Sequence, residues 1–182
     1  MLLSELVKRC QDQNTQAQRL LYERYAGRLF RVAQRYMRET MDAEDILVLS
    51  FQKIFEQITG FRYQDEAGTW LWMKTIVVNE CLMQLRRSAS FYLISGTETR
   101  EIAASDESVL DAISAETIQT LIAELPVGYR TVFNLVALEG YTHTEVALKL
   151  QISEGTSKSQ LSKARQLLQK KLQSLGYATQ VR

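Results

Sequence analysis

The chain has 182 residues, of which 46% are hydrophobic and 24% are charged, and its formal net charge is +1. No apolar run approaches the roughly 20 residues that cross a bilayer, and Glu5, Lys8 and Arg9 interrupt the N-terminal stretch where a signal peptide would be apolar. Cys10 and Cys81 stand far apart without CxxC spacing, which predicts neither a disulfide framework nor a zinc site. We therefore expect a cytoplasmic protein without membrane insertion.

Residue types needed for catalysis and metal binding are scarce. His143 is the only histidine, which excludes sites built from several histidines and argues against a histidine-based triad. The sequence contains no GxGxxG, no phosphate-binding loop and no GxSxG motif. We predict a protein that is not an enzyme, holds no metal and needs no cofactor.

The N-terminal region predicts a short helix over 2–11 and a long one over 15–38. In the long helix, apolar residues recur every three or four positions, which is typical of one buried face. A row of arginines follows the same spacing and comprises Arg24, Arg28, Arg31, Arg35 and Arg38. Such a row is most often a solvated face, and the alternative is a basic track for nucleic acid or an acidic partner.

Two further helices complete the first half. One begins at Asp42, because acidic residues are favoured in a first turn. Its apolar positions are too numerous for one stripe, so heavy burial is expected up to Gly60; they are Ile46, Leu47, Leu49, Phe51, Ile54, Phe55 and Ile58. A polar loop covers 61–68 and the other helix covers 70–87, with at least one of Trp70 and Trp72 expected in the core.

Residues 88–114 differ from the rest of the chain. They mix Ser, Thr, Gly and acidic residues without sustained periodicity and hold one basic and five acidic side chains. This composition predicts a flexible acidic linker between a first domain, 1–87, and a second, 115–182. A plain spacer and a tether that shields a basic face are both compatible with it.

The second domain predicts only helices, over 115–125, 128–139, 142–150 and 154–175. Thr142 and Glu145 have the spacing of a capping box. No segment of the chain has the alternation of a strand, so the predicted fold class is all-α: two small helical domains joined by a flexible acidic linker.

The last two of these helices predict a helix-turn-helix. The second is rich in Ser, Thr, Gln, Lys and Arg, and no acidic residue follows Glu154, so DNA phosphates would meet no carboxylate there. Gln151 occupies the turn, where a left-handed non-glycine residue costs about 1 kcal/mol. His143 is expected to be exposed or half-buried and not a ligand. The alternative to DNA binding is an amphipathic helix with a solvated basic face.

Three ordered blocks of sequence resemble the RNA polymerase sigma factors of the extracytoplasmic-function (ECF) group in the sigma-70 family. They are DAEDIL at 42–47 with FQKIF at 51–55, WMKTIVVNE at 72–80 with LRR at 85–87, and a third block from Leu125-Pro126 to Arg165 that contains SEGT at 153–156. The resemblance implies promoter-specific transcription initiation. The partners it implies are the clamp and flap of core RNA polymerase, promoter DNA and an anti-sigma factor.

The resemblance also implies roles for individual residues. Those matching the polymerase-binding helix are Asp42, Glu44, Asp45 and Phe51. Between Asp45 and Phe51, Val48-Leu49 stand where the family has Gln-Glu. Those matching the −10 helix are Trp72, Lys74, Asn79, Arg86 and Arg87, and Thr69 stands where the family often has Phe. Those matching the −35 surface are Thr156, Lys158, Ser159, Ser162, Lys163 and Arg165.

Two other functions fit the same pattern. A DNA-binding repressor or activator would dimerise through an apolar surface of its N-terminal domain and bind a palindromic operator. A helical adaptor, such as an anti-sigma-like binder, would not need the acid-free basic helix.

Overall fold

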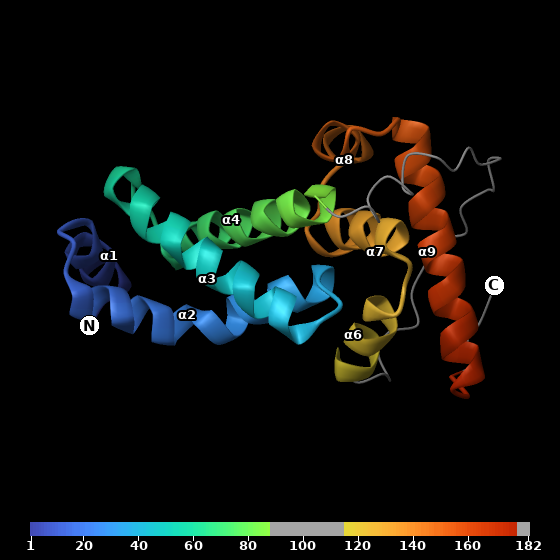
Figure 1. Cartoon of the computed structure of the whole chain (residues 1–182), viewed down its shortest axis with the longest axis horizontal. Helices are drawn as coiled ribbons and strands as arrows, with labels where there is room; N and C mark the ends of the chain where they lie inside the picture. The colour runs from blue at the N-terminus through green and yellow to red at the C-terminus, as the bar shows by residue number, and fades with distance from the viewer. Residues whose placement is uncertain (88–114, 178–182) are drawn as a thin grey trace. The chain divides into compact units, whose positions relative to one another are not determined.

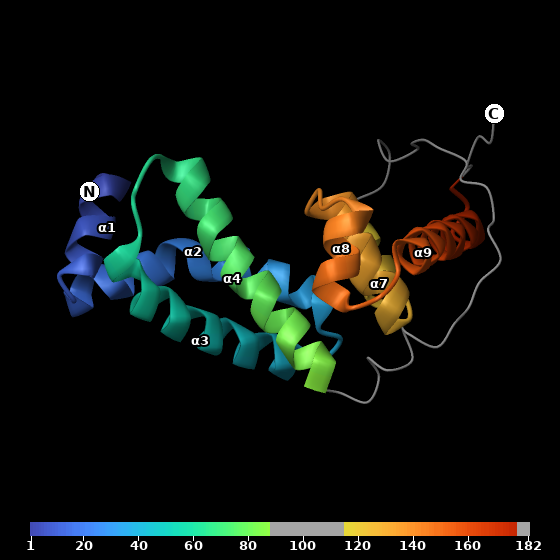
Figure 2. The same cartoon turned by 90° about the horizontal axis from the view of Figure 1, so that it is seen from above.

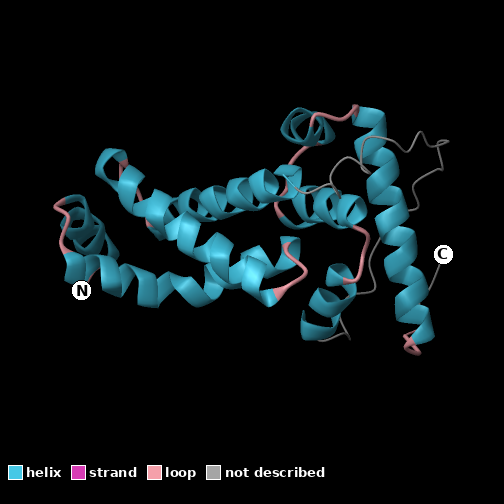
Figure 3. Cartoon of the chain, in the orientation of Figure 1, coloured by secondary structure: helices cyan, strands magenta, loops and turns pink. Residues whose placement is uncertain are grey.

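The computed structural model describes residues 1–87 and 115–177, and every regular element in these ranges is a helix (Figures 1 and 3). The all-α expectation with two helical domains is therefore confirmed. The predicted linker, 88–114, lies outside the described residues. The internal contacts group the chain into two compact units, Met1–Gln84 and Leu85–Arg182.

The first unit is built from four α-helices and one short 3-10 turn. Their bounds are α1 Leu3–Gln11, α2 Thr15–Tyr36, α3 Thr40–Gln57, η1 Ile58–Gly60 and α4 Glu66–Arg87. Figure 2 shows α2 and α3 running alongside each other with α4 passing across them. Their shared core is apolar and includes Leu21, Tyr25, Leu29, Ile46, Ile54, Met73 and Val77.

Several helix boundaries differ from the sequence predictions, and the largest differences in the first unit concern α2, α3 and α4. The arginine-bearing helix α2 ends at Tyr36, and α3 begins at Thr40. Helix α4 begins four residues before the predicted position 70, because the Asp65 carboxylate accepts a hydrogen bond from the Gly68 amide at 2.6 Å and caps the new first turn.

Helix α3 is less buried than predicted. Most of its apolar residues do lie in the core, but Leu49 is 44% exposed and the neighbouring Val48 is 64% exposed. The expectation for Leu49 was wrong, since α3 keeps an amphipathic character with one apolar pair on its outer side.

The second unit contains α6 Ala115–Ala123, α7 Val127–Phe133, the π-helical segment η3 Asn134–Leu138, α8 His143–Leu150 and α9 Glu154–Ser174. Arg130 is buried within this unit. Its guanidinium donates a hydrogen bond to the Ala123 carbonyl at 2.8 Å, which connects α7 to the end of α6. Helix α9 packs against α7 and α8, which leaves one side of α9 uncovered.

Candidate nucleic-acid interface

The predicted capping box starts helix α8. The Thr142 amide donates to the Glu145 carboxylate at 2.8 Å, and the Glu145 amide donates to the Thr142 hydroxyl at 3.2 Å. The bond from the Thr142 amide, and then one from the Thr142 hydroxyl at 2.8 Å, stabilise the carboxylate and hold the pKa of Glu145 below its usual value. The reciprocal pair fixes where the first helix of the helix-turn-helix begins.

The turn into α9 contains a left-handed residue at Gln151, where the motif commonly has glycine. Gln151 has φ 56° and ψ 43°, and the next amide, of Ile152, donates to the Ala147 carbonyl at 3.1 Å. The Ser153 hydroxyl then accepts from the Thr156 amide at 2.9 Å and caps α9. The sharp reversal thus comes from a strained glutamine followed by a serine cap.

His143 joins the two helices of the motif, a role that sequence reasoning missed. Its Nδ1 lies 2.8 Å from the hydroxyl of Ser157, which is buried on α9. The pKa of His143 is below its ordinary value of 6.5, chiefly because burial disfavours the charged ring, and Lys158 acts in the same direction. The half-buried histidine therefore stabilises the motif in its neutral form.

The residues that match the −35 surface all lie outside the buried side of α9. That buried side is formed by Ser157, Gln160, Leu161 and Ala164. Lys158 and Arg165 are exposed, whereas the other four are half-buried: Thr156, Ser159, Ser162 and Lys163. The uncovered side thus presents hydroxyl groups and cations, which suit phosphate oxygens and base edges.

One carboxylate lies at the start of this surface. Glu154 forms an ion pair with Lys158 at 2.8 Å and accepts a hydrogen bond from Thr144 at 3.2 Å. The bond to Lys158 is the main reason that the pKa of Glu154 is lowered. The spacing i, i+4 was the signal that could have predicted this pair.

Helix α4 separates the residues matched to −10 recognition into two groups. Trp72, Asn79 and Arg86 follow one another at seven-residue intervals on one side of α4, with Arg87 adjacent at its end. Lys74 lies about 200° around the helix from Trp72, since each residue turns it by about 100°. The structure therefore does not bring Lys74 together with the others.

Neither tryptophan is buried, contrary to the expectation that at least one lies in the core. Both are half-buried. The Trp72 ring stacks on Phe61 with centroids 4.2 Å apart, and the Trp70 ring lies beneath the Arg28 guanidinium at 4.1 Å. The Trp70 ring also lies nearly parallel to the Tyr25 ring, with centroids 6.5 Å apart. Thr69, where the family often has Phe, is buried and donates to the Asp65 carbonyl at 2.7 Å.

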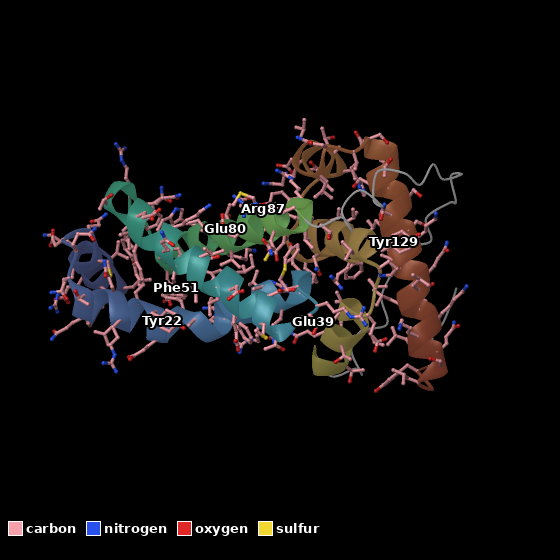
Figure 4. All side chains as sticks on the ribbon, in the orientation of Figure 1. Tyr22, Glu39, Phe51, Glu80, Arg87 and Tyr129 are labelled. Carbon is pink, nitrogen blue, oxygen red and sulfur yellow. The ribbon has the colours of Figure 1, made fainter. Side chains whose placement is uncertain are left out.

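The residues matched to polymerase binding do not all reach the surface. Asp42, Glu44 and Asp45 are exposed on α3. Phe51 is only 3% exposed and its ring packs 4.6 Å from that of Tyr22, between α2 and α3 (Figure 4). Phe51 therefore lies in the core between α2 and α3, whereas the three acidic residues lie at the surface.

A buried carboxylate joins α3 to α4. Glu80 is 6% exposed and accepts a hydrogen bond from the Lys53 ammonium at 2.7 Å. Sequence patterns within one helix cannot reveal this pair, because the two residues are 27 positions apart on different helices.

Comparison with known proteins identifies the family. Residues 21–91 match Sigma-70 region 2, and residues 115–168 match Sigma-70, region 4. The chain is 30% identical over 162 residues to the ECF RNA polymerase sigma factor SigM of Mycobacterium tuberculosis, across 89% of this chain and 80% of SigM. The chain belongs to the ECF sigma factors of the sigma-70 family. As such, it binds core RNA polymerase and promoter DNA and directs promoter-specific transcription initiation.

The chain is also similar to another ECF sigma factor in sequence and to a solved sigma factor in fold. The sigma-E factor of Haemophilus influenzae is 26% identical over 180 residues, covering 93% of this chain and 95% of the relative. Among solved structures, the sigma factor RpoE of Bartonella quintana, in complex with the anti-sigma factor NepR, shares the fold with a TM-score of 0.51. It is 21% identical, and the match covers 85% of this chain and 96% of RpoE.

Residues 1–87 and 115–177 contain neither a candidate membrane span nor a candidate metal site. No helix there combines the length and apolarity needed to cross a membrane. Within the same ranges, no three His, Cys, Asp or Glu side chains are grouped so that they could hold a metal ion.

Proposed function

We propose that this ECF sigma factor divides promoter recognition between two domains, 1–87 and 115–182, joined by the linker 88–114. The observation that carries the proposal is the capped helix-turn-helix, whose uncovered side on α9 presents hydroxyl and cationic side chains. That chemistry fits the major groove of a −35 element. The −35 residues of the proposal are Thr156, Lys158, Ser159, Ser162, Lys163 and Arg165.

The proposed −10 contacts lie on α4. Trp72, Asn79, Arg86 and Arg87 share the outer part of this helix, where an indole and an amide can stack on or hydrogen-bond an unpaired base and the arginines can hold phosphates. Lys74 acts apart from them, on another side of α4. The stack on Phe61 supports this assignment, because it orients the Trp72 ring before DNA binds.

Polymerase docking is assigned to the outer side of α3. Asp42, Glu44 and Asp45 supply negative charge there, and Val48 and Leu49 supply apolar area in place of the family's Gln-Glu pair. Exposed apolar side chains on a charged helix are typical of a surface that a partner covers. Binding to core polymerase therefore depends on apolar contact as well as on charge.

The remaining parts of the proposal follow from the family. The protein acts in the cytoplasm, where its polymerase is, and is a non-catalytic initiation factor without cofactor or metal. An anti-sigma factor is a proposed partner, supported by the complex in which the Bartonella quintana sigma factor was solved.

The decisive experiment is transcription by purified bacterial core polymerase, with and without this protein, on a library of start-site fragments. Discrete new transcripts that require the protein would support the proposal and give its −10 and −35 sequences. An absence of such transcripts, together with tight binding of the free protein to a palindrome, would overturn it in favour of a dimeric regulator.

A further inference from the structure

The arginine row of α2 has no part in the surfaces described so far. Arg24, Arg28 and Arg31 are exposed and Arg35 is half-buried. Their spacing of four, three and four residues places them on one side of α2, within about 60° of one another around the helix axis. Arg38 falls beyond the end of the helix at Tyr36 and does not extend the row.

This side of α2 meets the N-terminal half of α4. The Arg24 guanidinium pairs with the Glu66 carboxylate at 3.0 Å, and one turn further along both helices the Arg28 guanidinium lies over the Trp70 ring at 4.1 Å. Lys74 is one further turn along the same side of α4. Two members of the row, Arg24 and Arg28, are thus held by contacts with α4.

The charges along the row are unequally compensated. Glu66 neutralises Arg24, whereas no carboxylate in the described parts of the chain lies within 4.0 Å of the Arg28 or Arg31 guanidinium. A row that served only to fasten α2 to α4 would place an acidic residue opposite Arg28, as it does opposite Arg24. At that position the chain has a tryptophan instead.

A guanidinium over an indole is suited to binding phosphate. The cation–π contact uses the face of the guanidinium and leaves the N–H groups at its edge available for hydrogen bonds. Because the ring fixes the side chain in advance, less rotamer freedom is lost when a ligand binds. Phosphate oxygens match the planar fork of arginine donors better than single-point acceptors do.

We propose that Arg28, held on Trp70, and its neighbour Arg31 bind phosphates of the DNA backbone. We name these three residues the α2 phosphate site. It is a third DNA contact, separate from the −10 side of α4, since Trp70 lies about 200° around α4 from Trp72. The proposal rests on the proposed function, because a sigma factor brings this domain to promoter DNA.

The test measures how DNA binding depends on salt. Holoenzyme carrying R28Q and R31Q is compared with wild type on a promoter fragment, as intact duplex and with the −10 region premelted. We expect about 10-fold weaker binding near 0.1 M salt, and a slope of log K against log salt that is less steep by about 1.4 for single-strand phosphates or about 1.8 for duplex phosphates. The slope therefore distinguishes the two sources of phosphate.

Matched variants control for charge and folding. R19Q removes another exposed arginine of α2, one that pairs with Glu23 at 2.8 Å and lies off the row, and should change neither affinity nor slope. W70A should lower DNA affinity about 3-fold, because Arg28 loses its support, and W70F should restore most of it. Thermal unfolding of each variant separates these effects from loss of folded protein.

Two results would overturn the α2 phosphate site. One is an unchanged salt slope in R28Q/R31Q. The other is weaker binding to core polymerase with unchanged DNA affinity, which would identify an acidic protein surface as the occupant. The same slopes are measured for the free protein on single-stranded DNA of unrelated sequence, so that failure of promoter recognition by the wild type would leave this site still testable.

Discussion

The exposed sides of α3 and α9 differ in chemistry although both belong to long helices packed on a helical core. The outer side of α3 carries Asp42, Glu44 and Asp45 next to the apolar pair Val48 and Leu49. That of α9 carries hydroxyl groups and cations, with a single carboxylate, Glu154, at its first position. DNA phosphates would repel the first surface and attract the second. The chemistry of the two surfaces therefore suits different partners: α9 suits a polyanion, and α3 does not.

The strongest test of this difference reverses charge on α9. K158E/K163E should lower −35-dependent transcription by more than about 100-fold, because each substitution replaces attraction to a phosphate by repulsion. Transcription assays measure the loss, and a pull-down with core polymerase should show unchanged association. The neutral pair K158Q/K163Q should lose less. If transcription and polymerase association fell together, the assignment of α9 would be contradicted.

A charge reversal on α3 should have the opposite selectivity. D45R should weaken association with core polymerase by roughly 10-fold, since an exposed acidic contact becomes a repulsive one. DNA binding by the C-terminal unit should be unaffected. E5R, on α1, serves as a control for the change in net charge. Equal polymerase affinity in D45R and wild type would exclude this contact.

The apolar pair on α3 allows a finer test. V48Q/L49E restores the polar pair typical of the family and should weaken core binding by about 3- to 10-fold, because burial of two such side chains contributes roughly 1–2 kcal/mol. Surface plasmon resonance with immobilised core polymerase gives the ratio. Tighter binding would show that the pair contributes no apolar contact.

The smallest expected effect concerns how the stability of the folded protein depends on pH through His143. Folding lowers the pKa of His143, so the unfolded chain binds more protons below pH 6.5. The stability gained is fully present above pH 6.5 and is lost as pH falls through the lower folded pKa. Chemical unfolding between pH 7.5 and 5 should show this loss in wild type and a weaker dependence in H143Q. Identical profiles of stability against pH in wild type and H143Q would show that His143 is not the source of this dependence.

Local sequence patterns predicted the helix-turn-helix well. Thr142 and Glu145 form the capping box that their spacing indicates, and the turn follows at Gln151, as expected for a helix-turn-helix. Both features depend on residues close together in the chain, where hydrogen-bond geometry is determined by a few positions.

Features that depend on tertiary packing were not predictable in the same way. The resemblance to the family implied that Phe51 contacts polymerase, yet in the structure the Tyr22 ring packs against it and it lies in the core. The partners of Trp70 and Glu80 lie on other helices, at Arg28 and Lys53. A hydrophobic pattern shows that a face is buried or exposed, but it does not identify the neighbour that packs against it.

The bond between Lys53 and Glu80 has an evolutionary consequence. Glu80 is almost fully enclosed, so a mutation that removed the Lys53 ammonium would leave a largely buried carboxylate without this counter-ion. A mutation at either position is therefore deleterious until the other also changes. Among descendants of this gene, the two codons should be retained or replaced as a pair, which links the evolution of α3 to that of α4.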